Sequence, residues 1–152
     1  LIQEKGSGTR SIAKLYRGDT LNVLMPLGRG FTLPENGERM LLVGGGVGLA
    51  PMLFLGQTIR DRGGNPTFLL GAHTADSILE RAEFERLGRV FITTEDGSEG
   101  EKGFVTEHSV LQKERFDRLA VCGPKLMMKT MARYAQTKKI CCEVSLENKM
   151  AC

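Results

Sequence analysis

The sequence predicts an α/β fold in which a five-stranded parallel sheet is doubly wound, with helices on both faces. From residue 39 onward, short apolar runs alternate with longer amphipathic stretches. That alternation is typical of repeated strand–helix–strand units and a parallel sheet. The first apolar run leads directly into a cluster of glycines, as expected where a strand turns tightly into a helix.

Composition narrows the classes of function. The 152-residue chain has a net charge of +3 and 41% hydrophobic residues, which are ordinary values for a globular domain. The charge is spread along the chain, which argues against a dedicated nucleic-acid surface. No apolar run approaches about 18 residues, so no membrane span is expected. The four cysteines do not form the pattern of a disulfide framework, so we expect reduced thiols in a cytoplasmic protein.

The first part of the chain predicts less regular structure. Leu1–Lys5 is expected to end a strand, and Thr9–Tyr16 to form a short helix that Thr9 can cap. Thr20–Met25 alternates like a strand. Pro26–Glu38 is rich in glycine and proline and indicates a linker.

The remaining elements follow in regular order. Strands are expected at Met40–Val43, Thr67–Leu70, Val90–Thr94, Arg118–Val121 and Ile140–Leu146, and helices at Leu49–Asp61, Ser77–Leu87, Val105–Leu111 and Pro124–Gln136. Asp76 is placed to cap the second of these helices, and Pro124 suits the first turn of the last.

The strongest functional signal is the turn after the first of these strands, with the sequence LVGGGVGLAP over residues 42–51. Glycines there let backbone approach a ligand, and the following helix directs free N–H groups and its positive end at a phosphate. The candidate cofactor-binding residues are Gly44, Gly45, Gly46, Val47 and Gly48. A tight strand–helix connection without a ligand is the alternative. The spacing differs from the G-x-G-x-x-G fingerprint of other dinucleotide sites.

The segment GGGVGLAP resembles the nucleotide-binding turn of the ferredoxin–NADP reductase superfamily, and other segments resemble that superfamily in the same order. Gly8-Thr9 with Leu15 resembles its flavin pyrophosphate element, and PLGRGF at 26–31 resembles its linker. TEDGS at 94–98 resembles the segment near the adenosine half of the cofactor. Cys122-Gly123-Pro124 resembles the turn beside the nicotinamide.

The last residues narrow the resemblance. Glu143–Cys152 is similar to the E-x-S-L-E-x-x-M-x-C segment of dihydroorotate dehydrogenase B electron transfer subunits. That resemblance implies that Cys152 is the first ligand of a [2Fe-2S] cluster. Such a cluster needs four ligands, normally cysteine thiolates. The sequence stops at Cys152, so we expect no cluster in this chain by itself, where Cys152 would be a free thiol.

Two positions leave alternatives open. Glu95 and Asp96 end the third strand, where a carboxylate accepts hydrogen bonds from ribose hydroxyls but repels the extra phosphate of NADP. They therefore favour NAD, unless Asp96-Gly97 serves only as a turn. In the resembled family, Cys122 helps to orient the nicotinamide for hydride transfer; a buried structural cysteine is the alternative.

The other candidate ligands have simpler explanations. Cys141 and Cys142 lie on the last strand, where alternation sends one to each face, and packing is favoured over metal binding because no partner stands at metal-site spacing. His73 and His108 have no carboxylate or nucleophile at a readable spacing. A surface or loop role is therefore expected for both.

The resemblance implies an oxidoreductase subunit. Electrons from dihydroorotate oxidation would pass from FMN in a catalytic partner subunit, through [2Fe-2S] and FAD, to NAD in pyrimidine biosynthesis, within a hetero-oligomer. Residues 1–33 would end a flavin-binding barrel, 34–140 would bind NAD, and 141–152 would lead to the cluster. The family's isoalloxazine-binding motif lies upstream of Leu1, so the chain alone should bind FAD weakly and be inactive. Alternatives are a reductase subunit of a hydrogenase or transhydrogenase, or a non-enzymatic nucleotide sensor or scaffold.

Overall fold

The computed structural model describes residues 2, 4–24, 28–35 and 37–146. The chain divides into two compact units, Leu1–Gly30 and Phe31–Cys152. Within the described ranges, no helix is both long enough and apolar enough to cross a membrane.

The first unit contains one short helix, α1, which spans Ser7–Ile12. The Thr9 hydroxyl accepts hydrogen bonds from the amides of Lys5 at 3.0 Å and Gly6 at 3.1 Å, so it caps the start of the helix from inside its first turn. The strands predicted at 1–5 and 20–25 are wrong wherever those ranges are described. A strand needs a hydrogen-bonded neighbour, and the described residues of this unit supply none.

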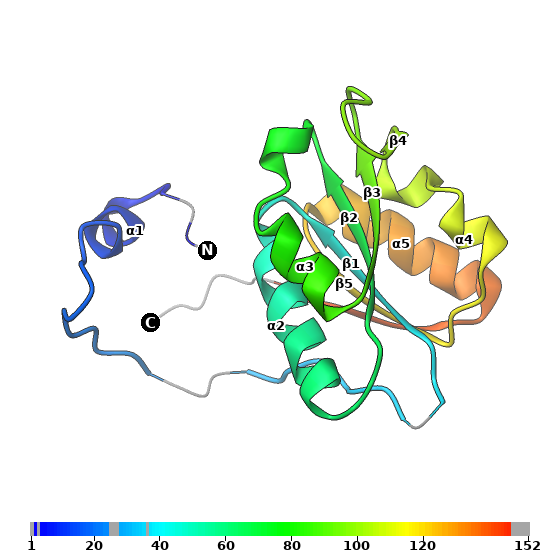
Figure 1. The fold of residues 1–152 in the computed structure, drawn as a ribbon, viewed down its shortest axis with the longest axis horizontal. Helices are drawn as coiled ribbons and strands as arrows, with labels where there is room; N and C mark the ends of the chain where they lie inside the picture. The colour runs from blue at the N-terminus through cyan, green and yellow to red at the C-terminus, as the bar shows by residue number, and fades with distance from the viewer. Residues whose placement is uncertain (1, 3, 25–27, 36, 147–152) are drawn as a thin grey trace. The chain divides into compact units, whose positions relative to one another are not determined.

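The second unit is built on a six-stranded sheet in which every pairing is parallel (Figure 1). The strands are β1 Met40–Gly45, β2 Thr67–Ala72, β3 Arg89–Thr94, β4 Glu101–Lys102, β5 Arg118–Cys122 and β6 Cys141–Val144, in the order β4-β3-β2-β1-β5-β6. The predicted parallel sheet is confirmed, with one strand more than expected. That strand is β4, whose two residues are too few to show a hydrophobic period.

Helices cover both faces of the sheet, as predicted. The helices are α2 Leu49–Asp61, α3 Arg81–Leu87, α4 Val110–Lys113 and α5 Lys125–Lys138, with 3-10 turns η1 Gly46–Gly48, η2 Ala75–Ser77 and η3 Val105–Glu107. Figure 1 shows α2 and α3 on one face and α4 and α5 on the other.

Two helix predictions need correction. The helix expected from Ser77 begins only at Arg81, and Asp76 lies inside η2 rather than at a cap. Glu80 separates the two pieces because its backbone is left-handed, with a φ of 59°, which no continuous helix accommodates. The helix expected over Val105–Leu111 is also divided, into η3 and α4.

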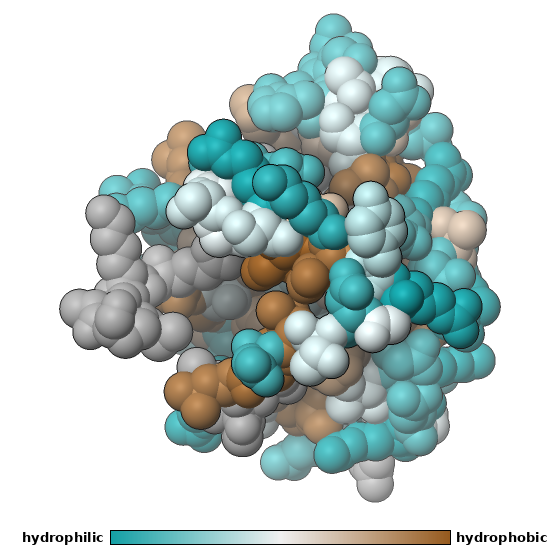
Figure 2. Space-filling model, turned by 90° about the vertical axis from the view of Figure 1, so that its left-hand side faces the viewer, coloured by the Kyte–Doolittle hydropathy of each residue, from teal (hydrophilic) through white to brown (hydrophobic). Residues whose placement is uncertain are grey.

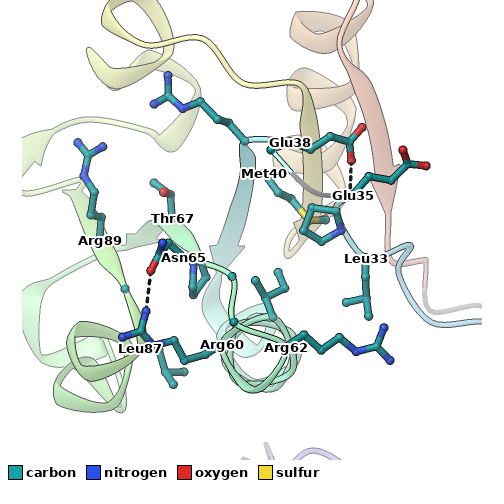
Figure 3. A pocket seen from close by; sticks show the side chains of 18 of the residues that line it. Leu33, Glu35, Glu38, Met40, Arg60, Arg62, Asn65, Thr67, Leu87 and Arg89 are labelled. Atoms are coloured by element: carbon teal, nitrogen blue, oxygen red, sulfur yellow. Dashed lines mark hydrogen bonds between the residues drawn. The ribbon is translucent and has the colours of Figure 1, made fainter.

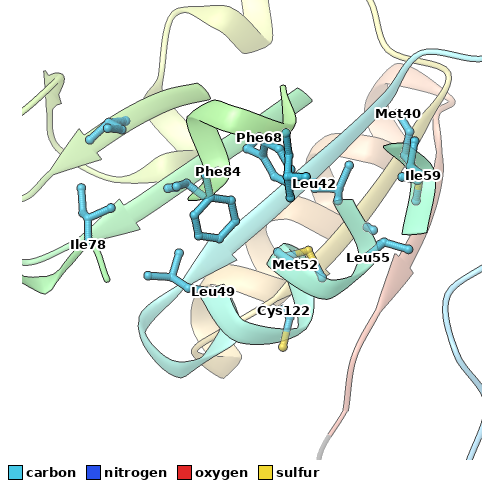
Figure 4. Close-up of a cluster of buried hydrophobic side chains, with 14 residues drawn as sticks. Met40, Leu42, Leu49, Met52, Leu55, Ile59, Phe68, Ile78, Phe84 and Cys122 are labelled. Carbon is cyan, nitrogen blue, oxygen red and sulfur yellow. The ribbon is translucent and has the colours of Figure 1, made fainter. Parts of the chain in front are cut away.

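A separate hydrophobic core lies on each side of the sheet. Along β1, Leu42 packs with α2 and α3 in the first core, whereas Leu41 and Val43 pack with α5 in the second. This alternation is the two-residue period of a strand, and all three side chains are fully buried. Figure 4 shows the first core, with Phe68 and Phe84 in edge-to-face contact at a centroid distance of 5.0 Å.

One arginine joins the segment before β1 to the last strand. Arg118 donates from Nε to Glu38 Oε2 at 3.3 Å and from Nη1 to Glu143 Oε1 at 3.2 Å. The second oxygen of Glu143 accepts the amide hydrogen of Thr32 at 3.0 Å. Arg118 Nη1 also lies 3.3 Å from the sulfur of Cys141, which is exposed. Cys142 packs into the second core, as alternation along the strand predicts, and burial raises the pKa of its thiol.

His108 lies in the short connection between η3 and α4, which agrees with the expected loop role, but it is buried, so the expected surface position is wrong. Only 6% of the residue is exposed, and its ring meets Phe91 edge-on at a centroid distance of 5.5 Å. Its Nδ1 accepts the amide hydrogen of Val110 at 3.0 Å, at the start of α4. Burial lowers the pKa of His108 below the usual histidine value. Its polar neighbours in the sequence conceal this burial.

We predict a pH dependence of stability that originates at His108. Because its pKa is lower in the folded than in the unfolded chain, the unfolded chain binds the proton more readily, so stability falls as pH drops through the usual histidine value of about 6.5. The Tm should therefore fall between about pH 7.5 and about pH 5.5, and it should fall less in His108→Asn. Circular dichroism melts of both proteins measure this, and parallel pH profiles would contradict it.

Candidate nucleotide-binding site

The order of the strands predicts a ligand-binding crevice at the carboxyl end of the sheet. From β1 the chain moves to β2 and β3 on one side, then returns to β5 and β6 on the other. Ligands of open α/β sheets bind outside the carboxyl ends of the strands at such a reversal. Here it lies between β1 and β5, where Gly44 pairs with Cys122. The predicted glycine turn and the Cys-Gly-Pro turn therefore meet at one edge.

Within the glycine turn, Gly46 and Gly48 differ in how much space surrounds their backbone. Gly46 has a φ of 56°, and a Cβ added to it would meet no atom within 4 Å. A Cβ on Gly48 would lie 2.1 Å from the carbonyl oxygen of Cys122. Gly48 therefore lets the start of α2 pack against the end of β5, whereas Gly46 leaves open space beside exposed backbone. Space of that kind is what a phosphate group needs.

The other glycines of the two turns are packed closely together. Added Cβ atoms on Gly45 and Gly123 would lie 2.8 Å from Met127 Sδ and 2.5 Å from Met127 Cε. A Cβ on Gly44 would lie 3.2 Å from Leu49. Pro124 precedes α5 at its N-cap. These residues shape the crevice by holding its two turns together, and Val47, half-exposed, lies on its rim.

Cys122 is buried at this edge. It is 7% exposed and belongs to the first core, where it lies at one end of the cluster in Figure 4. Its neighbours in that core include Leu49 and Met52 of α2. The structure therefore shows the packing role that the sequence left open, while its role beside a nicotinamide stays a prediction.

The two carboxylates after β3 are not equivalent. Glu95 Oε1 lies 2.9 Å from His73 Nδ1, and the Glu95 side chain is 41% exposed. Asp96 Oδ1 accepts hydrogen bonds from the hydroxyl of Ser98 at 2.6 Å and from its amide at 3.0 Å. These bonds lower the pKa of Asp96. Asp96 thus forms the turn that the sequence left as an alternative.

The sequence did not predict the contact between His73 and Glu95. In the parallel register, Ala72 of β2 lies opposite Thr94 of β3. The residues that follow, His73 and Glu95, therefore leave the sheet side by side. The predicted exposure of His73 is confirmed, with 82% of its side chain accessible. The equal position of His73 and Glu95, each one residue beyond the end of its strand, is the feature of the sequence that indicates this contact.

Apolar side chains reach the surface on this unit. Val47, Phe54 of α2 and Leu126 of α5 are exposed, the last two by 77% and 76%. Figure 2 shows hydrophobic residues at the surface among hydrophilic ones.

A separate cavity of about 1340 Å³ lies at the opposite, amino-terminal ends of β1, β2 and β3 (Figure 3). Three of its arginines have local explanations. Arg60 donates to Asn65 at 2.6 Å, and Arg89 forms an ion pair with Glu114 at 2.7 Å. Arg60 and Arg86 also lie in the last turns of α2 and α3, where positive charge stabilises a helix. Neither the glycine turn nor Glu95 lines this cavity.

The structure does not relate three predicted site residues to these two turns. Gly8 and Thr9 belong to the first unit. Cys152, the predicted cluster ligand, lies outside the described residues. Among the residues that are described, no group of three or more His, Cys, Asp or Glu could hold a metal ion.

The chain is similar to known oxidoreductases. Residues 42–133 match the family model of the oxidoreductase NAD-binding domain. Dihydroorotate dehydrogenase B (NAD(+)) electron transfer subunits are similar over nearly the whole chain. That of Caldanaerobacter subterraneus subsp. tengcongensis is 39% identical over 100% of this chain and 60% of its own length. That of Shouchella clausii is 41% identical over 97% of this chain and 57% of its own length. These relatives confirm the resemblance in the sequence, and the chain spans about three fifths of their length.

A solved structure gives the same result for the fold. A chain of an NADH-dependent reduced ferredoxin-NADP oxidoreductase superposes with a TM-score of 0.81 and 35% identity, over 95% of this chain and 53% of that one. The predicted fold is thereby confirmed.

We predict that Gly48→Ala destabilises the protein more than Gly46→Ala does. At position 48 the new methyl group meets the Cys122 carbonyl and forces backbone to move. At position 46 it meets no neighbour but adopts a left-handed backbone, which costs about 1–2 kcal/mol. Urea unfolding of both variants measures the difference in the free energy of unfolding. Equal losses would show that the contact between α2 and β5 is not close.

Proposed function

The chain belongs to the oxidoreductase NAD-binding domain family, and we propose that its crevice between β1 and β5 binds NAD(H) for hydride exchange with a flavin. The observation that carries this proposal is the open space at Gly46, at the point where the strand order reverses. The first amides of a helix lack partners within that helix. The turn from Gly46 into α2 therefore offers N–H groups and positive potential to a pyrophosphate.

The described residues fit the dinucleotide in separate parts. The glycine turn would hold the pyrophosphate, and the carboxylate of Glu95 would accept hydrogen bonds from the adenosine ribose. The turn of Gly123 and Pro124, with Cys122 behind it, would lie beside the nicotinamide. NAD supplies the carbon that accepts or donates the hydride, whereas these residues bind it, orient it and limit access of water.

We further propose that the intact protein is a dihydroorotate dehydrogenase B electron transfer subunit. Whole-chain identities of 39% and 41% to such subunits, together with the S-L-E-N-x-M-x-C segment, support it. Its partner would then be a catalytic FMN subunit that oxidises dihydroorotate in pyrimidine synthesis, and FAD and a [2Fe-2S] cluster would connect the two. Gly8 and Thr9 would contact the FAD pyrophosphate, as the family motif implies.

A second candidate has support of its own. The 35% identity to an NADH-dependent reduced ferredoxin-NADP oxidoreductase favours a reductase subunit of transhydrogenase type. Purifying the intact protein with its natural partner and assaying NAD reduction by dihydroorotate, against reduction by ferredoxin, separates the two candidates.

We predict that Gly46→Val weakens NADH binding at least about tenfold, or about 1.4 kcal/mol. A branched side chain would fill the space reserved for the pyrophosphate. NADH fluorescence titration of the intact protein measures the Kd, and circular dichroism checks folding. The matched control is Gly63→Val, since Gly63 also has a positive φ and open surroundings but lies at the far end of α2. A folded Gly46→Val protein with normal NADH affinity would remove the pyrophosphate from this turn.

We predict that Cys152→Ala in the intact protein removes most of the visible absorbance of a [2Fe-2S] cluster, because its four thiolate ligands act together. NADH binding should not change, since Cys152 has no part in the proposed nucleotide site. Absorbance and iron content report the first effect, and fluorescence titration reports the second. The exposed thiol Cys141 gives a matched control, Cys141→Ala. Full cluster occupancy in Cys152→Ala would refute the ligand assignment.

A further inference from the structure

We propose that His73 is a positioning residue that holds the carboxylate of Glu95 for the adenosine ribose of NAD, and that Asp96 takes no direct part in binding. This inference rests on the proposed function, because it needs the ribose to lie at the ends of β2 and β3. It assigns distinct roles to two acidic residues that the sequence could not separate.

The hydrogen bonds already made by each carboxylate distinguish Glu95 from Asp96. Asp96 Oδ1 is occupied by two hydrogen bonds from Ser98, which close the turn at Gly97, where φ is 79°. Glu95 has no such local partner among the described residues. Its Oε1 contacts only the imidazole of His73, across the gap between two strands. The other oxygen, Oε2, is left for the two hydroxyls of a ribose.

His73 and Glu95 are held in register by backbone contacts. The amide of Glu95 donates to Ala72 O at 3.1 Å, and the amide of Asp96 donates to His73 O at 3.3 Å. The Ser98 hydroxyl also accepts the amide hydrogen of Ala75 at 2.8 Å. The loops after β2 and β3 are therefore joined by hydrogen bonds, which keep the backbones of His73 and Glu95 side by side.

The exposure of His73 argues against a purely structural role. With 82% of its side chain accessible, the ring buries little surface. The nearby ion pair of Arg81 with Glu99, at 3.0 Å, already holds the loop after β3. An exposed glutamate has several rotamers, and binding a ribose through it requires that one be selected. The contact with His73 Nδ1 selects the rotamer before the ligand arrives, which lowers the entropic cost of binding.

The inference predicts an effect of His73 that depends on Glu95. In the intact protein, His73→Ala should weaken NADH binding about threefold to fivefold, the range of an exposed charged contact. NADPH binding should stay unchanged, because a 2′-phosphate gains no hydrogen bond from a carboxylate. In a Glu95→Ala background, His73→Ala should have no further effect. His73→Asn should restore most of the affinity, since its side-chain amide can donate from about the place of Nδ1.

Fluorescence titrations with NADH and with NADPH give all the dissociation constants. Arg81→Ala is the matched control, because it removes the other loop ion pair without touching Glu95; its NADH affinity should stay normal. Asp96→Asn keeps its acceptor oxygen and should also bind NADH normally.

Three results would overturn the inference. Normal NADH affinity in His73→Ala would remove the positioning role. Equal losses with and without Glu95 would show that His73 only orders the loop. A loss in Asp96→Asn, with none in Glu95→Ala, would reverse the roles of the two carboxylates. If instead no variant and no form of the protein bound NADH, the proposed function itself would fail, and this inference with it.

Discussion

The burial of β1 on both faces is the constraint on which the rest of the second unit depends. Its side chains alternate between two cores, and both of its edges are paired, with β2 and β5. Helices must therefore cover both faces, and the chain can leave β1 only at its end. There α2 must begin directly against the carbonyl of Cys122, which only glycine at position 48 permits. The crevice follows from the same constraint, because the chain diverges to opposite sides of β1.

The sequence predicts the buried strands of this fold well, and it predicts the edge strand β4 and the start of helix α3 poorly. Runs such as Met40–Val43 and Thr67–Leu70 are apolar because helices cover both faces of the sheet. The same burial that makes these sequences apolar therefore makes the strands recognisable. At the margins, other forces decide. β4 is held against Thr93, whose single hydroxyl hydrogen is shared between Glu101 O and Gly103 O. The delayed start of α3 depends on the left-handed backbone of Glu80. Neither feature leaves a periodic signal.

At the candidate site, the sequence predicts the turns that are formed by neighbouring residues. It does not predict the contacts between segments that are distant in the chain. The glycine turn and the Cys-Gly-Pro turn were placed correctly at the ends of strands. That Gly48 packs against β5 while Gly46 stays open depends on where a distant strand lies. The pairing of His73 with Glu95 likewise depends on strand register. The burial of His108 was missed because it comes from packing with distant residues such as Phe91 of β3, and a single sequence window does not show that.

Arg118 connects two outer segments of the second unit that are distant in the sequence. Its ion pairs with Glu38 and Glu143, together with the hydrogen bond from the Thr32 amide to Glu143, join the segment before β1 to the last strand, β6. Since Arg118 itself lies on β5, between β1 and β6, one guanidinium group holds both outer segments to the sheet. Outer segments that are held to one buried sheet in this way suit a site whose two turns must keep a fixed spacing.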